Sequence, residues 1–177
     1  MTMIREFFDI TMDSREIFEG LAIMDTEYVS QINSRPVIFL TLKDCKAATA
    51  SDLLELLKLE IYSEYLRYEK QLGGKLDKNS FEYMDFYKMI DTLRNPEASA
   101  VSFVSALQDL TRIARTFYQI APILLIDEYD QPIMSSYEFG YHDKVSTFFS
   151  NFYGKALKGN ARACSEQSPS VYPHNPP

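Results

Sequence analysis

The chain is poor in several residue types that common active sites require. Its 177 residues include no tryptophan, two cysteines and two histidines. Cys45 and Cys164 lack the spacing of a metal site and fit a reducing compartment. His142 and His174 are isolated in the sequence, and isolated histidines are more often surface residues than ligands. The composition therefore gives no support for a zinc site or a Ser-His-Asp hydrolase.

Basic runs and long apolar runs are also missing. Asp and Glu outnumber Lys and Arg by 25 to 18, and the formal net charge is −7. No Lys/Arg cluster forms the positive surface that nucleic-acid binding requires. The longest apolar run, residues 120–126, is too short to span a bilayer. Residues 1–13 lack the apolar core of a secretory signal. We therefore expect a cytoplasmic protein with no membrane contact and no direct nucleic-acid signal.

Only six glycines occur, and none belongs to a phosphate loop. Such a loop has the pattern G-x-x-x-x-G-K-[ST], in which backbone N–H groups wrap the phosphates of a nucleotide. The pairs Gly74-Lys75 and Gly154-Lys155 are not followed by Ser or Thr. Gly73-Gly74 is better explained as the end of a long helix. The sequence thus lacks the main phosphate-binding element of a nucleotide site.

The most informative feature that is present is the segment LLIDEYD, residues 124–130. Its apolar part predicts a strand of a parallel sheet that is buried on both faces. The acids then fall at the carboxyl end of the strand, where open α/β sheets bind ligands. An apolar strand that ends in Asp-Glu is typical of the Walker B segment of ATPases. In that role Asp127 would hold magnesium and Glu128 would orient or deprotonate the attacking water.

A simpler interpretation of these acids stays open. Strands often end in Asp or Glu because the chain leaves the core for water. Asp130 is a third carboxylate within four positions, and close like charges are costly unless a cation or hydrogen-bond donors compensate them. Magnesium or a nucleotide would supply that compensation. The sequence assigns no firm role to Asp130 itself.

Apolar periodicity and turn residues predict the remaining elements. The chain alternates strand, helices, strand and helix, which predicts an α/β fold of parallel strands joined by right-handed crossovers. From Ala161 onward, prolines and serines replace the apolar pattern, so we predict a disordered tail over residues 161–177. The expected elements are a helix at 3–9, a short helix and turn at 14–24, a strand at 36–43, a helix capped by Ser51 or Asp52 and ended by Gly73, a helix capped by Ser80, a helix through 103–117, the strand at 124–126, a loop over 132–141, and a helix from Asp143 to Gly159.

Several segments in order resemble a family of bacterial AAA-ATPase-like proteins, which often carry a restriction-endonuclease-like domain at the C-terminus. The resemblance covers residues 1–160. It implies a P-loop NTPase-like, three-layer α/β fold that uses ATP and Mg²⁺, with Asp127 on the metal side and Glu128 as the catalytic base. The segments that carry it are IREFF (4–8), IFEGLAI (17–23), RPVIFLTLKD (35–44), LLIDEYDQPI (124–133) and FFSNFYGKALKGN (148–160).

The resemblance also implies what is missing. The phosphate loop of the family precedes the segment that IREFF resembles, and its next strand follows the segment that KGN resembles. We therefore expect residues 1–160 to form an incomplete, truncated ATPase-like domain that lacks the phosphate-loop strand. Such a domain would bind neither ATP nor Mg²⁺ alone, so enzymatic activity stays open. The alternative is a non-catalytic protein-interaction module, whose partner would be a second copy or another protein.

Overall fold

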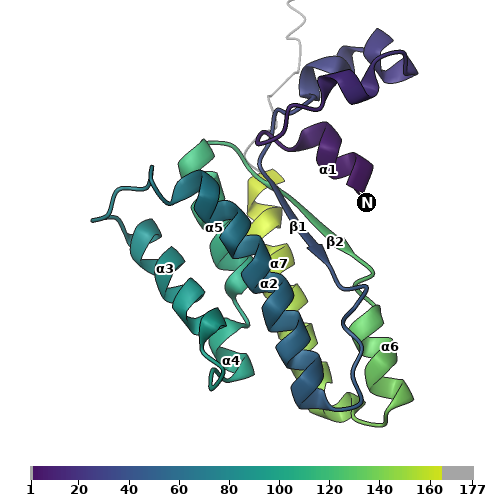
Figure 1. The fold of residues 1–177 in the computed structure, drawn as a ribbon, viewed down its shortest axis with the longest axis vertical. Helices are drawn as coiled ribbons and strands as arrows, with labels where there is room; N and C mark the ends of the chain where they lie inside the picture. The colour runs from purple at the N-terminus through teal and green to yellow at the C-terminus, as the bar shows by residue number, and fades with distance from the viewer. Residues whose placement is uncertain (1, 165–177) are drawn as a thin grey trace, which may run out of the picture.

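The computed structural model describes residues 2–164, with side chains through residue 158. Figure 1 shows a helical body, a small sheet along one side of it, and beyond the sheet an N-terminal arm formed by residues 2–31. No helix in the described part of the chain is long and apolar enough to cross a membrane. The elements are α1 (Thr2–Phe8), the 3-10 helices η1 (Arg15–Phe18), η2 (Ala22–Asp25) and η3 (Glu27–Gln31), β1 (Val37–Thr41), α2 (Ala50–Leu72), α3 (Phe81–Arg94), α4 (Ala100–Phe103), α5 (Ala106–Tyr118), β2 (Ile123–Asp127), α6 (Gln131–Glu138) and α7 (His142–Cys164).

The two described strands form a parallel sheet. Their register pairs Val37 with Ile123 at one end and Thr41 with Asp127 at the other. Both strands lie where their apolar, β-branched composition predicts them. The expectation of an α/β fold with parallel strands is therefore confirmed.

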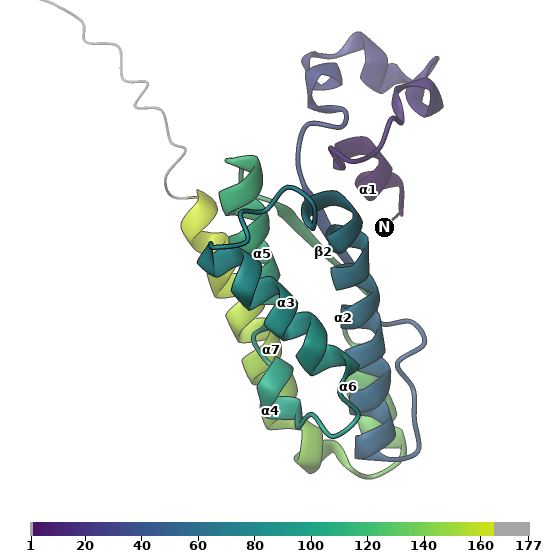
Figure 2. The same cartoon turned by 60° about the vertical axis from the view of Figure 1, so that its left-hand side comes forward.

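Helices α2, α5 and α7 cover one side of this sheet (Figures 1 and 2). Ile38 and Leu40 of β1 are buried in the core cluster, and Leu124 and Ile126 of β2 pack against it. Side chains alternate between the two faces of a strand. Phe39 therefore lies on the opposite face, where the guanidinium of Arg5 in α1 sits 5.4 Å from its ring centre.

The second strand is less buried than its composition predicts. Every residue of β2 is half-buried, because the long helices among the described residues lie on one side of the sheet (Figure 2). The prediction of a strand buried on both faces is thus wrong. The three-layer arrangement implied by the family resemblance is only partly seen within residues 2–164.

The outer edge of β1 is closed by side chains of α2. The Phe39 N–H donates to the Glu64 carboxylate at 2.9 Å, and the Tyr68 hydroxyl donates to the Val37 carbonyl at 3.0 Å. Arg67 also donates to the Val37 carbonyl, and it pairs with the fully buried Asp9 at 3.0 Å. These contacts satisfy the backbone of β1 and fasten the N-terminal arm to α2.

Helix starts follow local capping chemistry. The hydroxyl of Ser80 accepts the Tyr83 N–H at 3.1 Å, which confirms the predicted cap of α3. The caps predicted for α2, Ser51 and Asp52, are wrong because both lie inside the helix. Thr49 is the cap, and its hydroxyl accepts the Asp52 N–H at 3.2 Å.

The helices after residue 99 differ from the sequence prediction in three ways. The helix predicted through residues 103–117 is divided into α4 and α5. The last helix starts at His142, so Asp143 lies in its first turn rather than at the cap, and it continues past Gly159 to Cys164. The predicted tail therefore begins inside α7, and residues 165–177 lie outside the described part.

The segment after Pro132 was predicted as a loop but forms helix α6. Pro132 lies in the first turn of α6. Backbone N–H groups in a first turn have no partner inside the helix, so proline costs no hydrogen bond there. Gly73 does follow α2, although its backbone is right-handed helical rather than left-handed. A Cβ at Gly73 would lie 2.7 Å from both the Glu69 carbonyl oxygen and the Tyr87 hydroxyl, so a larger residue there would force the backbone as well as Tyr87 to shift.

Candidate functional site

Asp127 is the last residue of β2 and lies beside the last residue of β1, Thr41. The Asp127 carbonyl accepts the Leu42 N–H at 2.9 Å, which holds the two strand ends together. Because Ile126 packs against the core, strand alternation puts Asp127 on the face away from the main helices. The predicted site residue therefore lies at the carboxyl edge of the sheet, half-buried.

Glu128 leaves the strand in an unusual backbone conformation. Its φ is +52°, in the left-handed region that non-glycine residues rarely adopt. The Glu128 carbonyl accepts the Gln131 N–H at 3.0 Å, which turns the chain into α6. The side chain is exposed and has no hydrogen-bond or ion-pair partner among the described side chains. Strained backbone of this kind is often found at functional sites.

The loops that leave the two strands are joined to each other. The Tyr141 hydroxyl donates to the Ala47 carbonyl at 2.7 Å, and the Ala47 N–H donates to the Ser135 hydroxyl at 3.2 Å. Ser135 and Tyr141 are buried. This link holds the loop after β1 against α6, the helix that follows β2. The sequence showed no signal for it, because Ala47 is 88 residues from Ser135 and 94 from Tyr141.

The acids fit a magnesium ion that arrives with a nucleotide, but they do not form a metal site of their own. Among the described residues, no group of three or more His, Cys, Asp or Glu side chains could hold a metal ion. Magnesium bound to a nucleotide needs only one or two carboxylates, with phosphates and water filling the other positions. Asp127 could supply that carboxylate. Thr41, beside it, is a site neighbour that the sequence prediction missed, although it ends the first strand at the same edge.

Asp130 occupies the cap position of α6 but makes no capping hydrogen bond with its side chain. It is exposed and lies at the rim of a hollow of about 310 Å³ between the start of α6 and α7. Asp130 thus lies at the start of α6, and Asp127 ends β2.

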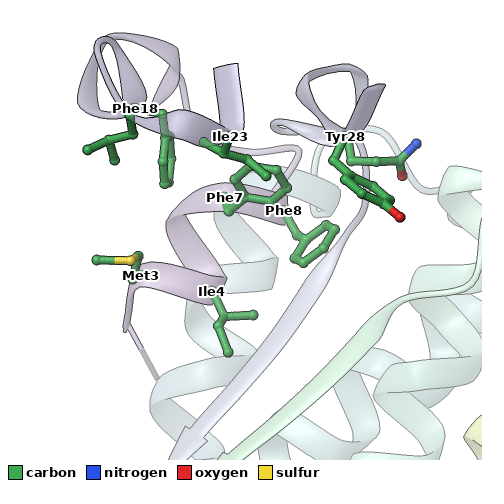
Figure 3. A pocket seen from close by; sticks show the side chains of 9 residues that line it. Met3, Ile4, Phe7, Phe8, Phe18, Ile23 and Tyr28 are labelled. Atoms are coloured by element: carbon green, nitrogen blue, oxygen red, sulfur yellow. The ribbon is translucent and has the colours of Figure 1, made fainter. Parts of the chain in front are cut away.

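An apolar groove of about 440 Å³ lies apart from the acids, in the N-terminal arm. Figure 3 shows α1 and the 3-10 helices around it, with apolar and aromatic side chains pointing toward one another. Several of these side chains are well exposed, among them Met3, Leu21 and Tyr28. No polar motif in the sequence indicated this surface.

Comparison with known proteins supports the resemblance found in the sequence. A family model described as "Predicted AAA-ATPase" matches residues 1–165. No curated protein and no solved structure matches the chain. The family match covers all the described elements, including both strands and the acids at positions 127 and 128. The chain therefore belongs to the AAA-ATPase-like family of predicted AAA-ATPases.

Proposed function

We propose that residues 1–160 form part of an ATP-binding and ATP-hydrolysing domain with a P-loop NTPase-like fold. The observation that carries the proposal is the Asp127-Glu128 pair at the carboxyl edge of a parallel sheet, with Glu128 in a strained turn. Family membership supports the use of a nucleotide and Mg²⁺ in general.

The two acids would have different tasks. Asp127 is half-buried at the strand end and next to Thr41, so its carboxylate is well placed to hold the magnesium ion of a bound nucleotide. Bound magnesium would neutralise the charge that develops on the transferred phosphoryl group. Glu128 is exposed beyond the strand, where its carboxylate could accept a proton from the attacking water.

The 177-residue chain alone should bind ATP weakly and hydrolyse it poorly. The backbone donors and the lysine of a phosphate loop supply most phosphate contacts in this class of site, and the sequence has no such loop. Titration calorimetry should therefore detect little Mg²⁺-dependent ATP binding. Micromolar binding by this chain would contradict the expectation that ATP binding needs a phosphate loop that this sequence lacks.

A second titration tests the site itself. A version of the chain that carries a phosphate loop ahead of residue 1 should bind ATP-Mg²⁺ more tightly, and Asp127→Asn should weaken that binding. Asp143→Asn is the matched control, because it removes the same charge from the exposed first turn of α7. Equal affinity in both variants would argue against a metal role for Asp127.

A non-catalytic interaction module is the second candidate, and the groove in Figure 3 favours it. Contiguous exposed apolar side chains are typical of protein-binding surfaces. Under this candidate, substitutions at Asp127 and Glu128 leave nucleotide binding unchanged in the extended chain. Ile4→Glu, at a 45% exposed position on the groove, would instead reduce self-association in sedimentation velocity.

A further inference from the structure

The hollow beside Asp130 has aromatic walls that meet at a corner. The rings of Tyr129 and Tyr153 are 6.4 Å apart and nearly perpendicular, with an interplanar angle of 89°. The Tyr153 hydroxyl donates to the Tyr129 carbonyl at 2.7 Å. Tyr153 also stacks on the buried Phe149, with ring centres 5.8 Å apart. Tyr153 is therefore held by the Tyr129 backbone and by Phe149, and the exposed Tyr129 ring lies against it at a right angle.

The rim of this hollow carries one carboxylate. Asp130 lines it together with Ile133 and His142. The Asp130 carboxylate makes no hydrogen bond to the start of α6, and it has no ion-pair partner among the described side chains. Burial is the main reason that the pKa of Tyr153 is raised, and the negative charge of Asp130 adds to the rise. Asp130 and Tyr153 line the same hollow.

We propose that this hollow binds the guanidinium group of an arginine side chain presented by a partner protein. Aromatic ring faces attract cations, and Asp130 supplies the opposite charge. The planar guanidinium can stack on a ring while donating two hydrogen bonds to a carboxylate, which an ammonium cannot do. The aliphatic stem of arginine would lie on the apolar floor formed by Ile133 and Phe149.

Charge complementarity selects this occupant over others. The chain carries a formal net charge of −7, and Glu128 lies two residues from Asp130. An anionic ligand would meet the negative charges of Asp130 and Glu128, and a neutral apolar ligand would gain nothing from the exposed Asp130 carboxylate. The proposal gives Asp130 a role that does not depend on nucleotide binding by Asp127 and Glu128.

The test is a titration followed by NMR of the folded 177-residue chain. The probes are N-acetyl-arginine amide, its citrulline counterpart, and a short Gly/Ser peptide with one arginine. We expect shifts of the Tyr129, Tyr153 and Phe149 signals with an affinity of about millimolar, as is usual for one weakly buried ion pair. Citrulline has nearly the same shape without the charge and should cause no shifts. The peptide should bind at least as well as the blocked amino acid.

Two variants and one control complete the test. Asp130→Asn and Tyr129→Leu are at exposed positions and should each weaken binding about tenfold, which is the effect of losing one charge-assisted contact. Asp143→Asn removes the same charge from a residue that does not line the hollow, and it should leave binding unchanged. The proposal is overturned if arginine causes no shifts, if citrulline binds equally, or if Asp143→Asn weakens binding as much as Asp130→Asn. Binding of the blocked amino acid but not of the peptide would also overturn it.

Discussion

Glu128 is the residue at which local backbone preference and the proposed chemistry conflict. A left-handed conformation costs a non-glycine residue about 1–2 kcal/mol. Glycine would avoid this cost at a position where φ is +52°. A glutamate at such a position is expected when its side chain is needed for function.

The first prediction follows from this strain. Glu128→Gly should be more stable than Glu128→Ala by about 1 kcal/mol in urea unfolding. The same pair of substitutions at Glu97, an exposed turn residue without a positive φ, should show the reverse order. If alanine is the more stable replacement at both positions, the left-handed turn at Glu128 is not present in solution.

The Cys45 side chain is fully buried. Burial raises the pKa of its thiol from 9.0 to about 12, and the charges of Glu60 and Asp44 add to the rise. In a Cys164→Ser background, iodoacetamide at pH 8 should therefore modify the folded protein much more slowly than the urea-unfolded protein. Equal rates in the two states would contradict the burial of Cys45.

At the scale of elements, Arg67 joins three parts of the molecule. Its guanidinium contacts Asp9 after α1, Glu64 on α2 and the backbone of β1. Asp9 is fully buried and Glu64 is 6% exposed. Among the described residues, removing the cation would leave Glu64 with only the Phe39 N–H, and Asp9 with Thr11 and with Arg5 at 3.7 Å.

Arg67→Ala should lower the free energy of unfolding by about 3 kcal/mol or more, the usual cost of breaking a buried ion pair from one side. Arg112→Ala is the control, because Arg112 pairs with Asp85 while its side chain is 43% exposed, and such pairs contribute under about 1 kcal/mol. Chemical denaturation measures both values. Similar losses in the two variants would show that Arg67 does not form its ion pairs with Asp9 and Glu64 in solution.

The sequence predicted the positions of helices and strands better than it predicted which of their faces other elements cover. Both strands and most helices followed from apolar periodicity, because that signal is local. Helix α6 was missed because Pro132 was interpreted as a turn, although proline is also favoured in a first helical turn. The half-buried state of β2 could not be predicted, because it depends on which elements cover each face of the sheet.

The candidate site shows the same limit. The positions of Asp127 and Glu128 at a strand end were predictable from an apolar run that stops at two acids. The left-handed turn of Glu128 and the corner formed by Tyr129 and Tyr153 were not, because they depend on contacts with α6 and α7. The role of these acids stays a prediction.

At the scale of the whole molecule, the two edges of the sheet differ. The edge of β1 is closed by Glu64, Arg67 and Tyr68. On the other edge, no partner among the described residues binds the backbone groups of Leu124 and Ile126, which the parallel register leaves facing outward. Open strand edges promote association between chains.

We therefore expect the 177-residue chain to self-associate and to melt no higher than the usual mesophile range of about 45–65 °C. Leu125→Lys puts a charge on the half-buried strand, on the face away from the core, and should reduce association in sedimentation velocity. Ile4→Glu in the apolar groove should leave association unchanged. A monomer at all concentrations with a sharp, reversible melt above this range would contradict the prediction that the outer edge of β2 drives association.

The buried titratable groups should make the fold sensitive to alkali. Burial raises the pKa of Cys45, Tyr65 and Tyr68 in the folded state. In the unfolded chain these groups lose their protons first, from about pH 9, so rising pH favours unfolding. Urea unfolding should show a free energy that is constant between pH 7 and 8 and then falls above about pH 9. A free energy that rises above pH 9 would contradict these pKa directions.

We propose that Asp127 and Glu128 form the hydrolytic pair of an ATPase. The most direct test is the hydrolysis rate of Glu128→Gln in a chain that carries a phosphate loop ahead of residue 1. Because glutamine has nearly the same shape but cannot accept the proton of water, we predict that turnover falls by about 10²–10⁴ while ATP stays bound. Asp127→Asn should lower both affinity and rate. Hydrolysis within about twofold of the parent in both variants would contradict the claim.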